Sequence, residues 1–193
     1  MSLPEALEPE TDTDNKLVAI YIAVLAVLLA ICSVGGGNAA KTVMTASIEV
    51  TDTYSFYQAR NVRQQGLRLA ADDFEIRLLQ PNLPEPMRKA MQEKITSHRA
   101  TADRYESDPK GGEGKKELLA KAKKLEGERD VALRQDPYFD YSAGLLQIAI
   151  VLASSSLILG GSLLLWASIG TGVLGTLLML NAFTLLVSVP FMG

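Results

Sequence analysis

The sequence predicts an all-α integral membrane protein, and three observations lead to this prediction. Residues 141–193 carry no Asp, Glu, Lys, Arg or His, and a water-soluble chain cannot easily bury such a stretch. A second uncharged apolar run lies near the N-terminus, at Leu17–Val34. The segment between the two holds all but one of the 19 basic residues and is rich in residues with high helix propensity. We therefore expect one N-terminal transmembrane helix, a polar middle forming a helical hairpin or coiled-coil-like bundle, and a C-terminal two-helix transmembrane hairpin.

Charge and composition exclude several functional classes. The formal net charge is −3, whereas nucleic-acid binding needs a basic face. Cys32 is the only cysteine, which excludes an intrachain disulfide and a Cys-rich zinc site. His98 is the only histidine, which leaves little material for a metal centre or a catalytic triad. We expect no cofactor, no metal, no nucleic acid and no small-molecule substrate.

The N-terminal part is predicted to contain a tail and a first span. Residues 1–16 hold five acidic residues and one basic residue, a composition typical of a disordered acidic tail. Residues 17–34 then form an apolar run that reaches roughly 27 Å as a helix, close to the thickness of the hydrocarbon core. The triplet Gly35–Gly37 follows. It predicts a loose junction at the membrane exit, and a hinge is the alternative interpretation.

Residues 35–140 are predicted to be a polar helical extramembrane domain. A long helix should end near Gln80, because three prolines lie between residues 81 and 86 and proline cannot continue a helix. A second helix is expected over Glu85–Glu106 and a third over Lys115–Gln135. Asp136-Pro137 should either end the third helix or start the next one. A narrow apolar stripe follows each of these two helices and predicts packing within the chain or between subunits. The stripe positions are Met87, Met91, Ile95, His98 and Ala102 on the second helix, and Leu118, Ala122 and Leu125 on the third.

The C-terminal region is long enough for two further spans, at residues 143–159 and 163–187, with a turn at Gly160–Ser162. Ser168–Gly172 is a second candidate for the turn. Small residues at helical spacing let helices approach closely in lipid, and amides can hydrogen-bond between helices. We expect both kinds of residue to hold the hairpin together. These membrane-packing positions are Gln147, Ser156, Gly160, Ser168, Gly172, Gly175 and Asn181.

Two segments resemble a known family. The first is Tyr57–Gln64, and the second runs from Glu128–Leu133 through Phe139–Tyr141 into Leu145–Ser154. Both are similar to a bacterial membrane family catalogued as domain of unknown function 4337. The resemblance implies three membrane spans in a bacterial inner membrane and supplies no functional residues.

The side of the membrane on which the middle lies stays open. Basic residues near the spans favour a cytoplasmic middle. The resemblance implies a basic turn in the final hairpin, which would put the middle outside, but this chain has Gly160–Ser162 there.

The sequence predicts a non-enzymatic structural or accessory membrane protein whose helical middle binds copies of itself or other membrane proteins beside the bilayer. One alternative is an accessory subunit of a larger energy-converting membrane complex. Another is an oligomeric channel or transport helper, which would need Gln147 and Asn181 to face a wet lumen.

Overall fold

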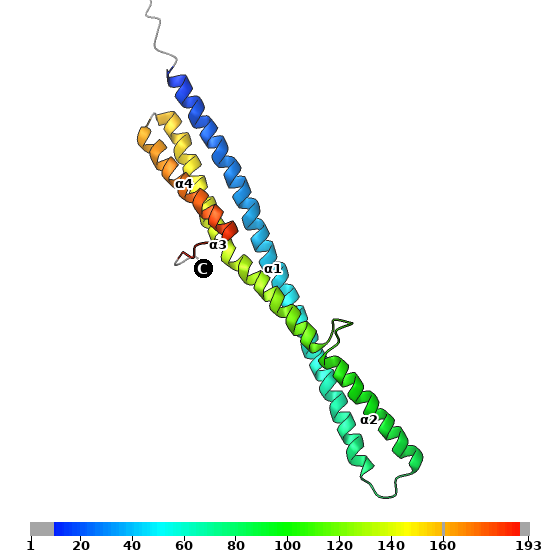
Figure 1. Cartoon of the computed structure of the whole chain (residues 1–193). Helices are drawn as coiled ribbons and strands as arrows, with labels where there is room; N and C mark the ends of the chain where they lie inside the picture. Colours follow the sequence, from blue (N-terminus) through cyan, green and yellow to red (C-terminus); the bar gives the residue numbers. More distant parts are fainter. Residues whose placement is uncertain (1–9, 160, 190–193) are drawn as a thin grey trace, which may run out of the picture. The chain divides into compact units, whose positions relative to one another are not determined.

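The protein is all-helical over the residues that the computed structural model describes, which are 10–159 and 161–189, with side chains from residue 15 on. Its helices are α1 (Glu10–Leu78), α2 (Glu85–Glu106), α3 (Lys115–Leu159) and α4 (Ser162–Thr184) (Figure 1). The described residues contain no strand. The helices α1, α3 and α4 are each long and apolar enough to cross a membrane. The predicted all-α class with three membrane-compatible segments is therefore confirmed.

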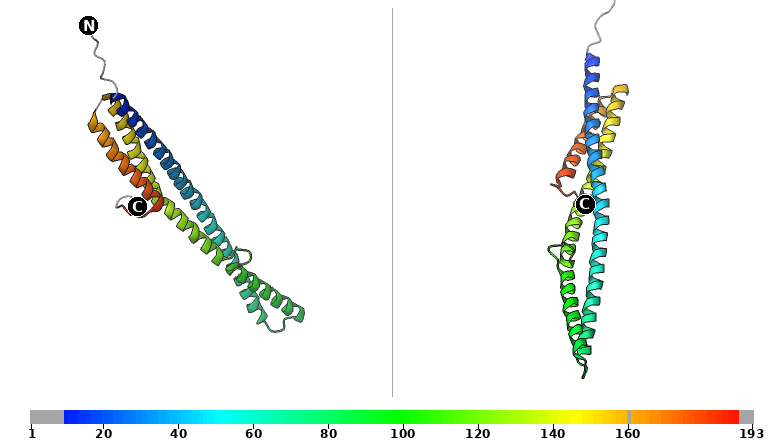
Figure 2. Two further views of the ribbon diagram at one scale, coloured as in Figure 1. Left: turned by 45° about the horizontal axis from the view of Figure 1, so that its top comes forward. Right: turned by 90° about the vertical axis from the view of Figure 1, so that its right-hand side faces the viewer.

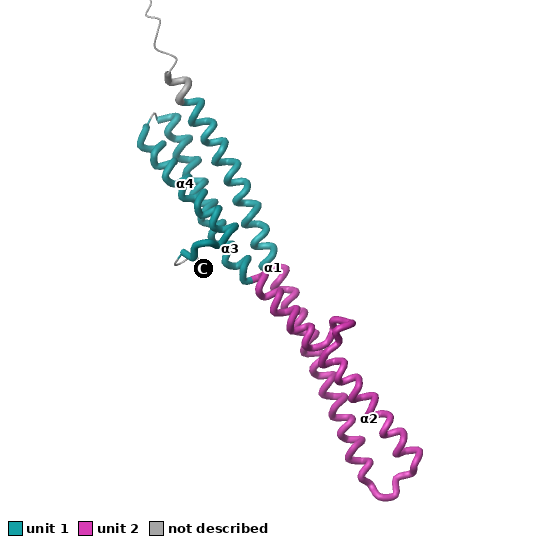
Figure 3. Tube along the Cα trace, in the orientation of Figure 1, with its two compact units in different colours: residues 1–43, 130–193 teal, residues 44–129 magenta. Residues whose placement is uncertain are grey.

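The chain divides into two compact units (Figure 3). Unit 1 comprises residues 1–43 and 130–193, and unit 2 comprises residues 44–129. Helices α1 and α3 contribute to both units. Each of them contains a predicted span and the adjoining polar segment in one continuous helix. Helix α1 already begins at Glu10, so the last residues of the predicted tail, 10–16, are helical. Residues 1–9 lie outside the described part.

Helix α1 continues without interruption through Gly35–Gly37, so the prediction of a loose junction is wrong. The physical reason is close packing. A Cβ atom on Gly35 would lie 2.5 Å from Phe139 Cε1 and 3.1 Å from Phe183 Cζ, and one on Gly36 would lie 3.2 Å from Phe139 Cβ. The first two glycines leave room for an aromatic side chain. Gly37 has no such neighbour within 4 Å.

Helix α3 likewise continues through Pro137, where the sequence predicts that one helix ends or the next begins. A proline inside a helix costs about 3 kcal/mol, because it removes a backbone hydrogen bond and crowds the preceding turn. The next two residues, Tyr138 and Phe139, are both buried in the core of unit 1. The packing of these two large aromatic side chains in the core offsets the cost of the proline. By contrast, α2 has the bounds that the sequence predicts.

Unit 1 packs α1, α3 and α4 side by side, as the views of Figure 2 show. Its core contains Leu25 and Cys32 of α1, Phe139 and Leu146 of α3, and Met179 of α4. Side-chain hydrogen bonds between the helices accompany this packing. Tyr21 Oη donates to Ser168 O (3.0 Å), Ser168 Oγ to Ala149 O (2.7 Å), Ser142 Oγ to Gly175 O (2.8 Å) and Cys32 Sγ to Phe139 O (3.2 Å). These polar groups are therefore satisfied inside the protein, as a lipid environment requires.

Buried positions recur every seven residues along the long helices. On α1 they are Leu25, Cys32, Ala39, Ala46 and Thr53, and on α3 they are Ala132, Phe139, Leu146 and Ala153. Many of these residues are small or weakly polar, so the hydrophobic pattern of the sequence looks ragged although the spacing of buried positions is regular. Seven-residue spacing is the geometry in which two helices stay in contact over many turns.

Candidate functional site

A buried polar cluster lies in unit 2, where α2 ends and α3 begins. At its centre is Gln64 of α1, which is 1% exposed. Its Nε2 donates to the carbonyl of Ala102 (2.9 Å) and to Glu106 Oε2 (3.0 Å). Lys115 Nζ donates to Gln64 Oε1 (2.9 Å) and lies 3.3 Å from Glu106 Oε2. One amide therefore connects α1, the last residue of α2 and the first residue of α3.

Aromatic rings complete the cluster. Lys115 Nζ lies 5.7 Å from the centroid of the Tyr57 ring, and the guanidinium of Arg60 lies 4.8 Å from that of Tyr105. Cations over ring faces are attracted by the ring quadrupole. Arg60 also forms an ion pair with Glu113. We call this set the junction cluster; its members are Tyr57, Arg60, Gln64, Tyr105, Glu106 and Lys115.

The junction cluster coincides with one of the two segments that carry the family resemblance. Tyr57, Arg60 and Gln64 are spaced three and four residues apart, which places them on one face of α1. Sequence reasoning did not select these three residues, although their spacing on one helix face was the one signal that the sequence offered. The partners of Gln64 on α2 and α3 are 38 to 51 residues away in the chain, and nothing in the sequence indicates that pairing.

The loop between α2 and α3 is held by side chains of its own. Glu117 accepts hydrogen bonds from Ser107 Oγ (2.7 Å) and from the backbone N–H of Asp108 (3.1 Å). Gly114 is buried, and a Cβ there would lie 2.4 Å from Asp108 N. The segment 108–114 thus closes tightly on the start of α3.

Two carboxyl groups of this region have lowered pKa values. Hydrogen bonds from Gln64 and then from Lys115 lower the pKa of Glu106 below the ordinary value of 4.5. Hydrogen bonds from Ser107 and from the Asp108 amide lower the pKa of Glu117 in the same way. Donors favour the ionised form of a carboxyl group, so both side chains are negatively charged at neutral pH.

Acidification should therefore destabilise this region. A carboxyl group whose pKa is lowered by folding stabilises the folded state fully above its unfolded pKa, and this contribution is lost as the pH falls through the folded value. We expect the thermal midpoint of helix unfolding, followed by circular dichroism in a non-ionic detergent, to fall as the pH drops below 4.5. In Glu106→Gln the fall should be smaller, because that side chain no longer titrates. An identical fall in the two proteins would contradict the assignment.

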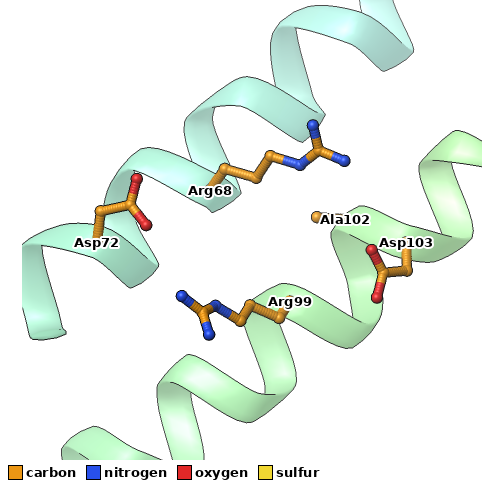
Figure 4. A pocket seen from close by; sticks show the side chains of 5 residues that line it. All are labelled: Arg68, Asp72, Arg99, Ala102 and Asp103. Atoms are coloured by element: carbon orange, nitrogen blue, oxygen red, sulfur yellow. The ribbon is translucent and has the colours of Figure 1, made fainter.

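A shallow pocket opens between α1 and α2 in unit 2, with a volume of about 270 Å³. Arg68 and Asp72 of α1 face Arg99 and Asp103 of α2 across it (Figure 4). Arg99 is paired with Glu75 at 2.6 Å. Two basic and two acidic residues leave the rim without net charge, so it has no preference for an ion of one sign. Within the described ranges, no group of three or more His, Cys, Asp and Glu side chains could hold a metal ion.

The predicted extramembrane stripe lies in unit 2 and is buried to different degrees. Ile95, Ala102 and Ala122 are buried, while Met87 is 50% exposed. The ring of His98 stacks on Phe74 of α1, with centroids 6.1 Å apart, so this side of α2 faces α1. The remaining members, which are half-buried, are Met91, His98, Leu118 and Leu125.

The predicted membrane-packing residues of unit 1 also differ from one another. The small ones, Ser156, Ser168, Gly172 and Gly175, are buried. A Cβ on Gly172 would lie 2.7 Å from Tyr21 Oη, and one on Gly175 would lie 3.1 Å from Leu146 Cγ. Gly160 lies outside the described residues.

The two amides of unit 1 take different roles. The side chain of Asn181 donates to Val187 O (2.8 Å) and accepts from Val187 N (2.9 Å), so it caps the end of α4. Gln147 is exposed, and none of its side-chain hydrogen bonds is found in the described part of the chain. Hydroxyl groups form hydrogen bonds between the helices instead. Ser168 is one of the predicted packing positions, whereas Tyr21 and Ser142 were not selected from the sequence.

Comparison with known proteins gives one match. The model of the family described as a domain of unknown function (DUF4337) matches residues 14–185. The chain matches no curated protein and no solved structure.

Proposed function

Since the chain belongs to the DUF4337 family, whose description names no activity, we propose a function from the geometry alone. The protein is a non-enzymatic structural or accessory membrane protein. Unit 1 anchors it in a bilayer through α1, α3 and α4, and unit 2 is a helical docking part that binds copies of the chain or another membrane protein.

The observation that carries this proposal is the uneven distribution of exposed apolar side chains in unit 2. All residues of unit 2 are described, and its large exposed apolar side chains lie mostly on α1. The others are Leu79 in the loop after α1, Met87 on α2 and Leu119 on α3. Exposed apolar side chains gathered along one water-exposed helix mark an interaction surface. Those on α1 are Met44, Ile48, Phe56, Val62, Leu69 and Ile76.

The junction cluster supports the same proposal from inside the unit. Its polar groups are hydrogen-bonded to one another across three helices, and no buried side-chain N or O atom of the described residues lacks a partner. Satisfied buried networks rigidify the elements that they connect. A rigid helical unit presents its outer face in one defined arrangement, which favours specific binding because little ordering is needed on association.

The proposal also includes the membrane and the side on which unit 2 lies. The three apolar helices belong to a multi-pass protein of a bacterial inner membrane, and the basic residues that flank the spans favour unit 2 in the cytoplasm. Labelling Gln92→Cys, which is exposed on α2, with a membrane-impermeant maleimide tests this. Inverted vesicles should react, whereas intact cells should not. The opposite pattern would place unit 2 outside.

Affinity purification of the full chain from native membranes in a mild detergent tests the function. We expect a second copy, or another membrane protein at fixed stoichiometry, to elute with it. Phe56→Ser should lower this recovery, because it removes an exposed apolar ring from α1, whereas the matched change Met87→Ser on α2 should not. A strict monomer that elutes without any companion would contradict the proposal.

A further inference from the structure

Within unit 2, one face of α1 carries an apolar stripe that α2 and α3 leave uncovered. Val62, Leu69 and Ile76 are 71%, 72% and 67% exposed. Ala59 and Gly66 lie between them and are exposed too, and a Cβ on Gly66 would meet nothing within 4 Å. We call this the outer stripe; its members are Ala59, Val62, Gly66, Leu69, Asp73 and Ile76.

The spacing of the outer stripe is that of a helix-pairing seam. Successive members are three, four, three, four and three residues apart, the alternation at which one helix contacts a second helix over several turns. Gln64 and Ala71 are both fully buried against the other helices of unit 2. They lie seven residues apart, on the side of α1 opposite this seam. The stripe therefore faces directly away from α2 and α3.

We propose that a second copy of this chain covers the outer stripe, with the two α1 helices parallel and in register. The inference rests on the proposed function and names the partner of unit 2. Two copies anchored by the same spans have the same orientation in the bilayer, so a two-fold axis that relates them runs along the membrane normal. Their α1 helices then run in the same direction.

Charges beside the stripe favour the parallel arrangement. Ala59, Gly66 and Asp73 hold the first position of successive seven-residue repeats. In a parallel pair, the residue just before each first position lies opposite the residue five places later in the partner helix. Asp72 then faces Arg77 of the other copy. Within the described residues Asp72 forms no ion pair; Arg99 faces it across the shallow pocket but binds Glu75. Arg77 of a second copy would give Asp72 a countercharge. An antiparallel pair would bring the side of Arg63 against that of Arg77, which like charges disfavour.

Asp73 is the one charged member of the outer stripe. Arg77 Nε binds its Oδ2 at 2.8 Å on the same helix, which neutralises the carboxylate before any pairing. A single polar group at such a position fixes the register of paired helices at some cost in affinity.

Disulfide trapping of the full chain in native membrane vesicles tests the proposal. Val62→Cys, Leu69→Cys and Ile76→Cys, each made alone, should give a covalent dimer under mild oxidation, since equal positions of a parallel pair face each other. Ala90→Cys, an exposed site on α2, should stay monomeric. The natural chain should stay monomeric as well, because Cys32 is buried. Trapping at position 69 without trapping at 62 and 76 would indicate an antiparallel pair and overturn the proposal.

Charge exchange provides a second readout. In the Leu69→Cys background, Asp72→Arg should weaken dimerisation by about two- to thirtyfold, because a two-fold dimer loses two exposed ion pairs. The exchange Asp72→Arg with Arg77→Asp should restore it only in part, because it also removes the ion pair between Arg77 and Asp73. Unchanged dimer yield in the single variant would overturn the assigned register.

The outcomes also separate this proposal from the proposed function. If no position gives a dimer but another protein co-purifies and is lost in Leu69→Glu, a different partner covers the stripe, and only the self-pairing proposal fails. If no dimer forms and no companion protein is recovered, both proposals fail.

Discussion

Replacing Gly35 with valine is expected to destabilise unit 1 by about 2–3 kcal/mol, the cost of overpacking a core that cannot relax. The Cβ atom alone would come within 2.5 Å of the Phe139 ring. That ring cannot move aside easily, because it is 3% exposed and packs edge-on against Phe183, with centroids 4.9 Å apart. Thermal unfolding in detergent, followed by circular dichroism, should show a lower midpoint than for the natural chain.

The same glycine triplet offers a matched control. Gly37→Ala places a methyl group where nothing lies within 4 Å, and alanine has a higher helix propensity than glycine by about 1 kcal/mol. Its midpoint should stay level or rise. Combining Gly35→Ala with Phe139→Leu should recover part of the loss seen in Gly35→Ala, since the smaller side chain makes room. If Gly35→Val unfolds like Gly37→Ala, Gly35 does not pack against Phe139.

Replacing Gln64 with leucine is expected to destabilise unit 2 by about 2–3 kcal/mol, the cost of leaving buried polar partners unsatisfied. Leucine is similar in size, so the change mainly removes the amide. The carbonyl of Ala102 loses its donor, and the ammonium of Lys115, whose side chain is 14% exposed, loses an acceptor. Hydrogen exchange of the backbone amides at the end of α2 and the start of α3 should accelerate, and the unfolding midpoint should fall.

The neighbouring residue Gln65 is the control for this substitution. It has the same side chain and helix but is exposed, so Gln65→Leu should change stability by no more than about 0.5 kcal/mol. Equal effects at the two positions would mean that the hydrogen bonds of Gln64 contribute nothing specific.

Local rules predicted the elements of this protein best where no distant contact opposes them. The absence of charge after Asp140 predicts the C-terminal apolar helices, and the prolines between residues 81 and 86 predict the gap between α1 and α2. Local rules failed at Gly35–Gly37 and at Pro137. At both places Phe139 or its neighbour Tyr138 packs into the core of unit 1, and this tertiary packing outweighs the helix-breaking tendency of glycine and proline.

The candidate site was harder to predict than the fold. The junction cluster joins Gln64 to Lys115 across 51 residues of sequence, and a sequence by itself does not indicate such a pairing. In the same way, Asn181 and Gln147 look equivalent in the sequence, yet one caps its own helix end and the other is exposed. Which face of a helix meets its neighbours depends on packing that a local pattern does not determine.

The seven-residue recurrence of buried positions constrains how relatives of this protein can differ in length. Insertion or deletion of residues in unit 2 would rotate every later buried position of α1 or α3 out of its interface unless whole sevens were involved. Seven residues advance a helix by about 10.5 Å, so a matched gain or loss must occur on the helix that runs alongside. Length variation among homologues should therefore come in multiples of seven that are matched on the neighbouring helix. Otherwise it should be confined to the two loops of unit 2, at residues 79–84 and 107–114.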